Sequence, residues 1–259
     1  MIALMAMVVP GASHFAMAQE ISTPALHVYG PGGPLAAMEE AAERFGKARG
    51  VQVLVTGGPE AKWIDRAQQD ADLIYGGAEY MLSQFAMKYP ALVDRTAREE
   101  LYVRASGILV RKGNPKNIRT LEDLTRPGIR ILDVEGAGQL GMWEDMAGSA
   151  PLIHGIQKNI TVVVGNTADG IEKWKSMPDL NAWITFESWH FRLKNETDLV
   201  RLPENQRVYR GTPIAITSVS KNKDLAREFI RYLKSAEGRE IFMKWGWADR
   251  GARPMKAKK

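Results

Sequence analysis

The sequence contains no cysteine, which excludes a disulfide scaffold, a cysteine nucleophile and thiolate-bound metal centres. It also lacks a G-x-x-x-x-G-K-[ST] phosphate loop, a G-x-S-x-G nucleophile elbow and an H-E-x-x-H zinc motif. His27, His154 and His190 are isolated and show no metal-ligand spacing. These absences predict a protein with no catalytic residues, no metal site and no cofactor.

An excess of basic residues is confined to the C-terminus. The chain has 35 basic and 30 acidic residues, a formal net charge of +5. After position 249 there is no acid, and the basic side chains there are Arg250, Arg253, Lys256, Lys258 and Lys259. Residues 1–249 are therefore balanced in charge, and residues 251–259 form a basic tail. No basic stripe with interleaved aromatics is present, so we expect no nucleic-acid partner.

The first 18 residues contain no charged side chain. An apolar run over 2–9 is followed by Pro10 and by the A-x-A pattern of residues 16–18. This pattern is typical of a secretory signal peptide cleaved near Ala18, and it predicts a periplasmic protein. A buried N-terminal helix is the alternative. No other stretch reaches the roughly 20 apolar residues that span a bilayer, so we expect no stable membrane insertion.

Strand-like and helix-like segments alternate from Ala25 onward, which predicts an α/β fold with parallel strands. We expect one lobe over 25–104 plus 210–250 and a second lobe over 105–209, inserted in the first. The connecting strands would be 105–111 and 213–219. Two crossings define a hinge, and a ligand would lie in the cleft between the lobes.

Five strand-to-helix turns are short and rich in small residues. Such turns lie at the carboxyl ends of parallel strands, where ligands bind, and their free N–H groups bind anions without a cationic side chain. Glycine lets the backbone approach the ligand closely, although it is also common in such turns for conformational reasons alone. The predicted ligand-binding residues in the turns are Gly32, Gly33, Thr56, Gly57, Gly58, Gly76, Gly77, Ala137, Gly138, Gln139, Asn166 and Thr167.

Residues outside these turns are further candidates. Glu187 would accept a hydrogen bond from a hydroxylated or protonated ligand, and Arg210 is a candidate cation of the cleft. Trp63 and Trp143 follow glycine-rich turns and are candidates for its walls. The spacing G-x-G-x-x-G over 136–141 suggests a dinucleotide site, but no acid ends the next strand to bind a ribose.

Three phrases resemble accessory colonization factor C, a group similar to the molybdate/sulfate class of ABC-transporter binding proteins. They are HVYGPGGP at 27–34, ADLIY at 71–75 and GAGQLGMWED at 136–145. The resemblance covers about 25–247 and implies a two-lobed, type II periplasmic-binding-protein fold. It also implies a tetrahedral oxyanion held by hydroxyls and N–H groups of the turns, including Thr185/Phe186. The first two turns carry glycine where that class offers serine.

The expected function is capture of a small anionic solute, sulfate-like or molybdate-like, by a monomer that delivers it to a membrane permease or sensor. One alternative keeps the fold and binds a small hydroxylated organic acid through Glu187 or Arg210. A second is a secreted colonization or interaction factor for which ligand binding is secondary. A third is a two-lobed transferase of similar architecture.

Overall fold

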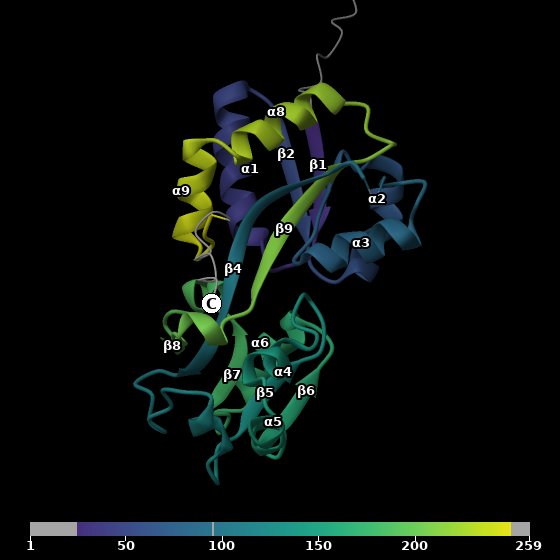
Figure 1. Cartoon of the computed structure of the whole chain (residues 1–259). Helices are drawn as coiled ribbons and strands as arrows, with labels where there is room; N and C mark the ends of the chain where they lie inside the picture. The colour runs from purple at the N-terminus through teal and green to yellow at the C-terminus, as the bar shows by residue number, and fades with distance from the viewer. Residues whose placement is uncertain (1–24, 95, 250–259) are drawn as a thin grey trace, which may run out of the picture.

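The computed structural model describes residues 25–94 and 96–249 (Figure 1). The predicted signal peptide, residues 1–18, and the basic tail, residues 251–259, lie outside the described residues. The expected α/β class is confirmed: a curled sheet is flanked by helices along its whole length.

The strands of the described residues belong to one continuous sheet. They are β1 (Ala25–Gly30), β2 (Gln52–Gly57), β3 (Leu73–Tyr75), β4 (Arg98–Arg111), β5 (Ile131–Val134), β6 (Ile160–Val164), β7 (Ala182–Phe186), β8 (Thr197–Val200) and β9 (Tyr209–Ile216). Their order is β2-β1-β3-β9-β4-β7-β5-β6, and β8 pairs with β4. The pairs toward the two ends of the sheet, β1–β2, β1–β3, β5–β6 and β5–β7, are parallel, as the alternation of strands and helices predicts.

The helices cover both faces of the sheet. They are α1 (Leu35–Arg49), α2 (Ile64–Asp70), α3 (Glu79–Lys88), α4 (Met142–Ala147), α5 (Ala150–Gln157), α6 (Thr167–Ser176), α7 (Ser188–Arg192), α8 (Lys223–Leu233) and α9 (Ala236–Lys244). Short 3-10 turns are η1 (Glu60–Lys62), η2 (Glu122–Thr125) and η3 (Glu204–Gln206). The first turn of α1 follows Pro34, whose fixed φ suits a helix start.

The end of the sheet that contains β1 is buried on both faces. Leu73 and Tyr75 of β3 pack in a cluster with α1, α8 and α9, whereas Ile74 packs in a cluster with α2 and α3 on the opposite face. Successive strand side chains point to opposite faces, so a strand covered on both sides reads as an unbroken apolar run. Figure 1 shows these two helix layers on either side of β1 and β9.

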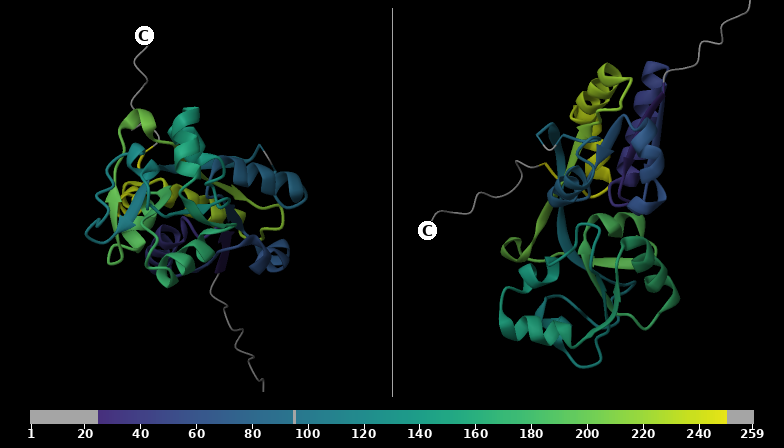
Figure 2. Two further views of the ribbon diagram at one scale, coloured as in Figure 1. Left: turned by 90° about the horizontal axis from the view of Figure 1, so that it is seen from below. Right: turned by 90° about the vertical axis from the view of Figure 1, so that its right-hand side faces the viewer.

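The other end of the sheet has its own core. Residues of β4, β5 and β7 pack with α4, α6 and α7 around Trp174 and Trp183, which are fully buried. Figure 2 shows these two bodies, which we call the first and second halves, joined by the long strands β4 and β9. The exact lobe boundaries, 25–104 plus 210–250 and 105–209, stay a prediction.

The long joining strands differ from the expected segments. β4 begins at Arg98 rather than 105, and β9 begins at Tyr209 rather than 213. They pair antiparallel from Arg98 to Ala105, so each strand is fixed by a partner about a hundred residues away in the chain. The polar residues at the start of β4 give no apolar pattern, which is why periodicity alone missed this part. The sequence pattern does not predict α3, α5, α7 or β8 either.

Candidate ligand-binding cleft

Glycine-rich turns of both halves line one cleft of about 660 Å³. The turns that follow β1, β2 and β3 contribute from the first half, and those that follow β5 and β6 contribute from the second. The carboxyl ends of parallel strands meet at one edge of a sheet, which brings turns distant in sequence together. Of the predicted residues, those that line the cleft are Gly32, Gly33, Gly57, Gly58, Gly76, Ala137, Asn166 and Thr167.

Several backbone N–H groups at these turns are free. Within the described part of the chain, the amides of Gly32, Gly33, Gly77, Ala137 and Gly138 donate to no backbone carbonyl. Such groups carry partial positive charge and point their hydrogens at solvent or at a ligand. The turns therefore offer several donors to an anion.

Two side chains brace the second half's turns. Gln139 is buried, and its Nε2 donates to Oγ1 of Thr167 over 3.3 Å. Asn166 caps α6 by accepting a hydrogen bond from the Asp169 amide over 3.0 Å. Because the Asn166 oxygen is used as a cap, its contribution to the site is to fix the start of the helix.

Apolar and aromatic side chains form the walls of the cleft. Trp63 lines it as predicted, and its Nε1 donates to the Gly58 carbonyl over 3.1 Å. Phe85 packs on Trp63 with ring centroids 5.7 Å apart, and Trp189 lines the cleft from α7. Trp143, the other predicted wall residue, packs instead in the core of the second half. Pockets of a few hundred Å³ with such walls enclose ligands larger than a bare tetrahedral oxyanion.

Arg104 places a positive charge directly beneath the turns. Its side chain is 1% exposed, and Nη2 donates to the carbonyls of Gly77, over 2.7 Å, and Ala137, over 3.3 Å. The guanidinium also stacks on Phe186, 3.8 Å from the ring centroid. Nε and Nη1 have no hydrogen-bond partner, and no carboxylate among the described residues forms an ion pair with Arg104.

Three turn glycines make room for this guanidinium. A Cβ built on Gly33 would lie 2.7 Å from Nη1 of Arg104, and one on Gly138 would lie 3.0 Å from Nη2. A Cβ on Gly77 would lie 3.3 Å from Nη2. Burial lowers the pKa of Arg104 to about 9, because desolvation disfavours the charged form. A buried charge without an ion pair is costly, and although Tyr80 and Glu79 act on it favourably, an anion at the turns would offset more of this cost.

The G-x-G-x-x-G glycines are explained by packing. A Cβ on Gly136 would lie 2.3 Å from the Gly165 carbonyl oxygen, and Gly138 faces Arg104. Gly141 has a φ of 66° at the start of α4, a conformation that favours glycine. Each glycine therefore has a local reason that involves no nucleotide.

Six of the predicted residues are not among those that line the cleft: Thr56, Gly77, Gly138, Gln139, Glu187 and Arg210. Gly77 and Gly138 lie against Arg104, and Gln139 bonds Thr167. Thr56 is exposed, because the alternation of β2 turns its side chain away from the cleft. Glu187 bonds Nε of Arg201 through Oε2 over 3.1 Å, and Arg210 lies 3.6 Å from Asp145. Both charges are thus paired by neighbours outside the cleft lining.

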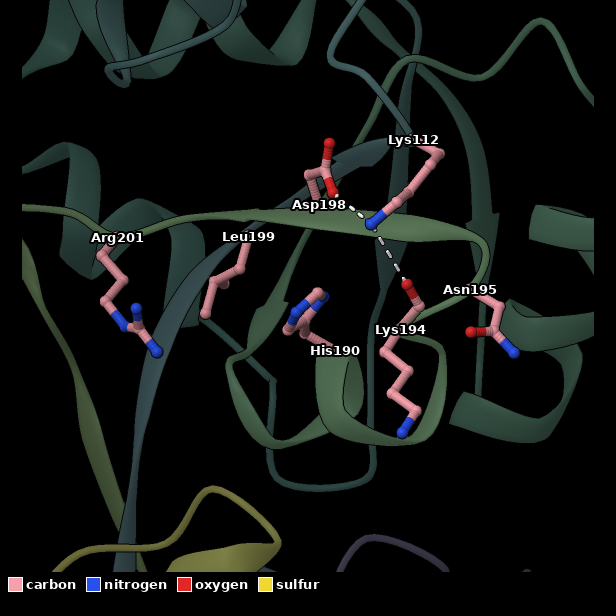
Figure 3. Close-up of a pocket in the computed structure, with 7 residues that line it drawn as sticks. All are labelled: Lys112, His190, Lys194, Asn195, Asp198, Leu199 and Arg201. Atoms are coloured by element: carbon pink, nitrogen blue, oxygen red, sulfur yellow. Dashed lines mark hydrogen bonds and ion pairs between the residues drawn. The ribbon is translucent and has the colours of Figure 1, made fainter.

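A second hollow lies around β8 and α7, and its charges are mostly paired. It is lined by Lys112, His190, Lys194, Asn195, Asp198, Leu199 and Arg201 (Figure 3). Lys112 bonds Asp198 over 2.8 Å, and Nδ1 of His190 lies 3.0 Å from Oγ1 of Thr197. Figure 3 shows Lys194 and Arg201 on opposite sides of His190, with their charged ends apart.

Within the described residues, no group of three or more histidines or acids is arranged to hold a metal ion. Over the same residues, no helix has the length and apolarity needed to cross a bilayer.

Two halves of one sheet with glycine-rich turns facing a shared cleft are typical of solute-binding proteins. The family model for the bacterial extracellular solute-binding protein matches residues 26–248, and the chain belongs to this family. Proteins of this family are solute-binding proteins.

Solved structures extend the comparison. The chain is similar to Peb3 from Campylobacter jejuni, with 32% identity, a TM-score of 0.79 and coverage of 87% of this chain and 100% of that one. A structure of L-phospholactate-bound PEB3 matches at 31% identity, a TM-score of 0.80 and the same coverage. The sulfate-binding protein SubI from Mycobacterium tuberculosis shares the fold at 18% identity and a TM-score of 0.71, over 88% of each chain.

A curated relative supports the expected resemblance. The chain is 27% identical to the molybdate-binding protein ModA of Mycobacterium bovis over 145 residues, which are 54% of this chain and 52% of ModA. The match thus spans about half the length of the curated relatives. Together with the family model, these similarities confirm the predicted likeness to molybdate- and sulfate-binding proteins.

Proposed function

We propose that this protein captures a small organic anion outside the cytoplasm, between lobes formed by 25–104 plus 210–250 and by 105–209. The observation that carries the proposal is Arg104, a fully buried guanidinium with two unpartnered nitrogens beneath glycine turns of both halves. Free N–H groups at the same turns supply the hydrogen bonds, and the buried charge attracts the anion.

Closure of the two lobes would sequester the ligand. Arg104 donates to Gly77 in the first half and to Ala137 in the second, so its contacts bridge the cleft. A ligand held by turns of both halves has greater affinity for the closed state and shifts the open–closed equilibrium toward it. An ABC permease or a sensor in the membrane would then recognise the closed form.

The walls of the cleft favour an organic anion over a bare oxyanion. Trp63, Phe85 and Trp189 offer apolar surface that sulfate or molybdate would leave unused. The similar PEB3 structure contains L-phospholactate, which joins a phosphate to a small organic acid. Sulfate or molybdate is the second candidate, favoured by the match to ModA and by the turns' neutral donors.

Thermal unfolding in the presence of single solutes tests the proposal. The panel contains sulfate, molybdate, phosphate, lactate and phospholactate, and calorimetric titration follows for each solute that stabilises. A ligand at 100 times its Kd adds about 2.7 kcal/mol to the free energy of unfolding. Stabilisation by no solute at millimolar concentration would overturn the proposal and favour the interaction-factor alternative. Cell fractionation tests the proposed periplasmic location.

A further inference from the structure

A second arginine faces the cleft from α7. Arg192 lines the cleft, and its Nη1 donates to the Gly32 carbonyl in the first half over 2.8 Å. Its guanidinium lies over Trp189, 4.6 Å from the ring centroid. These two contacts fix the direction of the side chain, so the guanidinium is held at the cleft although Arg192 is an exposed residue.

The charge of Arg192 is not neutralised by an ion pair. Among the described residues no carboxylate bonds it, although Glu39 is near enough to act on it electrostatically. Desolvation by burial lowers the pKa of Arg192, and Glu39 opposes this shift without forming an ion pair. By contrast, Arg201, three residues beyond Asp198, is bonded to Glu187.

An unpartnered hydroxyl accompanies this arginine. Tyr75 lines the cleft from β3, is 1% exposed and has a hydroxyl with no hydrogen-bond partner among the described residues. Tyr75 and Arg192 line the same cleft, Tyr75 from β3 and Arg192 from α7. The Tyr75 hydroxyl and the Arg192 guanidinium can therefore both donate hydrogen bonds to an acidic group of a ligand in the cleft.

The two arginines flank a single turn. Arg104 approaches Gly33, and Arg192 bonds the carbonyl of the adjacent Gly32. One acidic group at the free amides over Arg104 would leave Arg192 unpaired. A ligand with two acidic groups would pair both cations at once.

We propose that Arg192 determines specificity by binding a second acidic group of the ligand, so that the substrate class is a small organic molecule with two acidic groups. This inference rests on the proposed function, because it assumes that the first acidic group lies at the glycine turns. Tyr75 supplies a further hydrogen bond to the second group.

Calorimetric titration of Arg192→Gln separates this role from a purely structural one. The probes are phospholactate, which has two acidic groups, and inorganic phosphate, which has one. We expect Kd for phospholactate to rise ten- to hundredfold and Kd for phosphate to change less than threefold. Arg192→Lys keeps the charge but loses the planar pair of donors, and it should give an intermediate loss for phospholactate alone.

Lys194→Gln is the matched control, because Lys194 is an exposed cation two residues from Arg192 that does not line the cleft. Its effect on both ligands should stay below threefold. Equal losses for phospholactate and phosphate in Arg192→Gln would show that Arg192 only joins the two halves, and would overturn the inference. Wild-type binding of phosphate or sulfate without binding of phospholactate would overturn it too, while leaving the proposed function intact. Wild-type binding of no anion would overturn both.

Discussion

Replacing Arg104 with methionine removes the buried charge and keeps an unbranched side chain. Nη1 lies 2.7 Å from the Cβ position of Gly33, so an anion on the other side of this turn would be a few ångströms from the guanidinium. A unit charge about 5 Å away contributes about 3 kcal/mol at an effective dielectric constant of about 20. That energy corresponds to a rise of about a hundredfold in Kd.

Calorimetric titration with the best ligand of the panel, together with thermal unfolding without ligand, is the assay. Arg104→Met should weaken binding without lowering the melting temperature of the ligand-free protein, because the desolvation cost of a buried charge with no ion pair and two unpartnered nitrogens offsets the hydrogen bonds that it makes. The loss of stability that usually follows substitution of a buried residue is therefore not expected here.

Arg111→Met is the control on the same strand. Arg111 also stacks on an aromatic ring, 3.8 Å from the centroid of Trp174, but its nitrogens bond the carbonyls of Leu180, Trp174 and Met177. Its replacement should lower stability and leave Kd unchanged. An affinity of Arg104→Met within threefold of wild type would refute the view that buried charge drives anion capture.

Two further predictions concern stability. Gly136→Ala should lower the free energy of unfolding by about 1–3 kcal/mol, because the new Cβ would clash with the Gly165 carbonyl oxygen. Gly165→Ala is the control, because a Cβ at Gly165 would have no atom within 4 Å. Its free energy of unfolding in the same denaturant titration should be nearly that of the wild type. Burial raises the pKa of Asp133 to about 6, so the folded state binds this proton more tightly than the unfolded state. Relative to Asp133→Asn, the wild-type protein should lose about 3 kcal/mol of stability as pH rises from about 4 to above 6. Parallel pH profiles of the two proteins would contradict the assignment.

The glycine turns were predictable because their signals are local. A short apolar strand, a run of small residues and an amphipathic helix recur along the chain, and parallel strands bring such turns to one edge. Gly32, Gly57 and Ala137 therefore line one cleft although they are far apart in sequence. Thr56 was predicted in the cleft but its side chain is exposed. Successive side chains of a strand point to opposite faces, but the sequence does not tell which of the two faces meets the cleft.

The two arginines were not predicted, for different reasons. Arg104 is a lone charge in an apolar stretch of β4, a signal that marks a buried functional group, but it lies in a joining strand and not in a turn. Arg192 belongs to the five-residue helix α7, which is too short to show periodicity. Its contact with Gly32 joins residues 160 positions apart.

The order of residues thus determined which segments form strands, which turns can donate N–H groups to an anion, and that the strands next to β1 and β5 run parallel. Only the tertiary structure decided which charges are paired and which are not. Glu187 and Arg210 have partners, whereas Arg104 lacks one, because pairing depends on side chains brought together by the antiparallel joining strands and by short helices between distant segments. The distances between such side chains cannot be read from the local sequence.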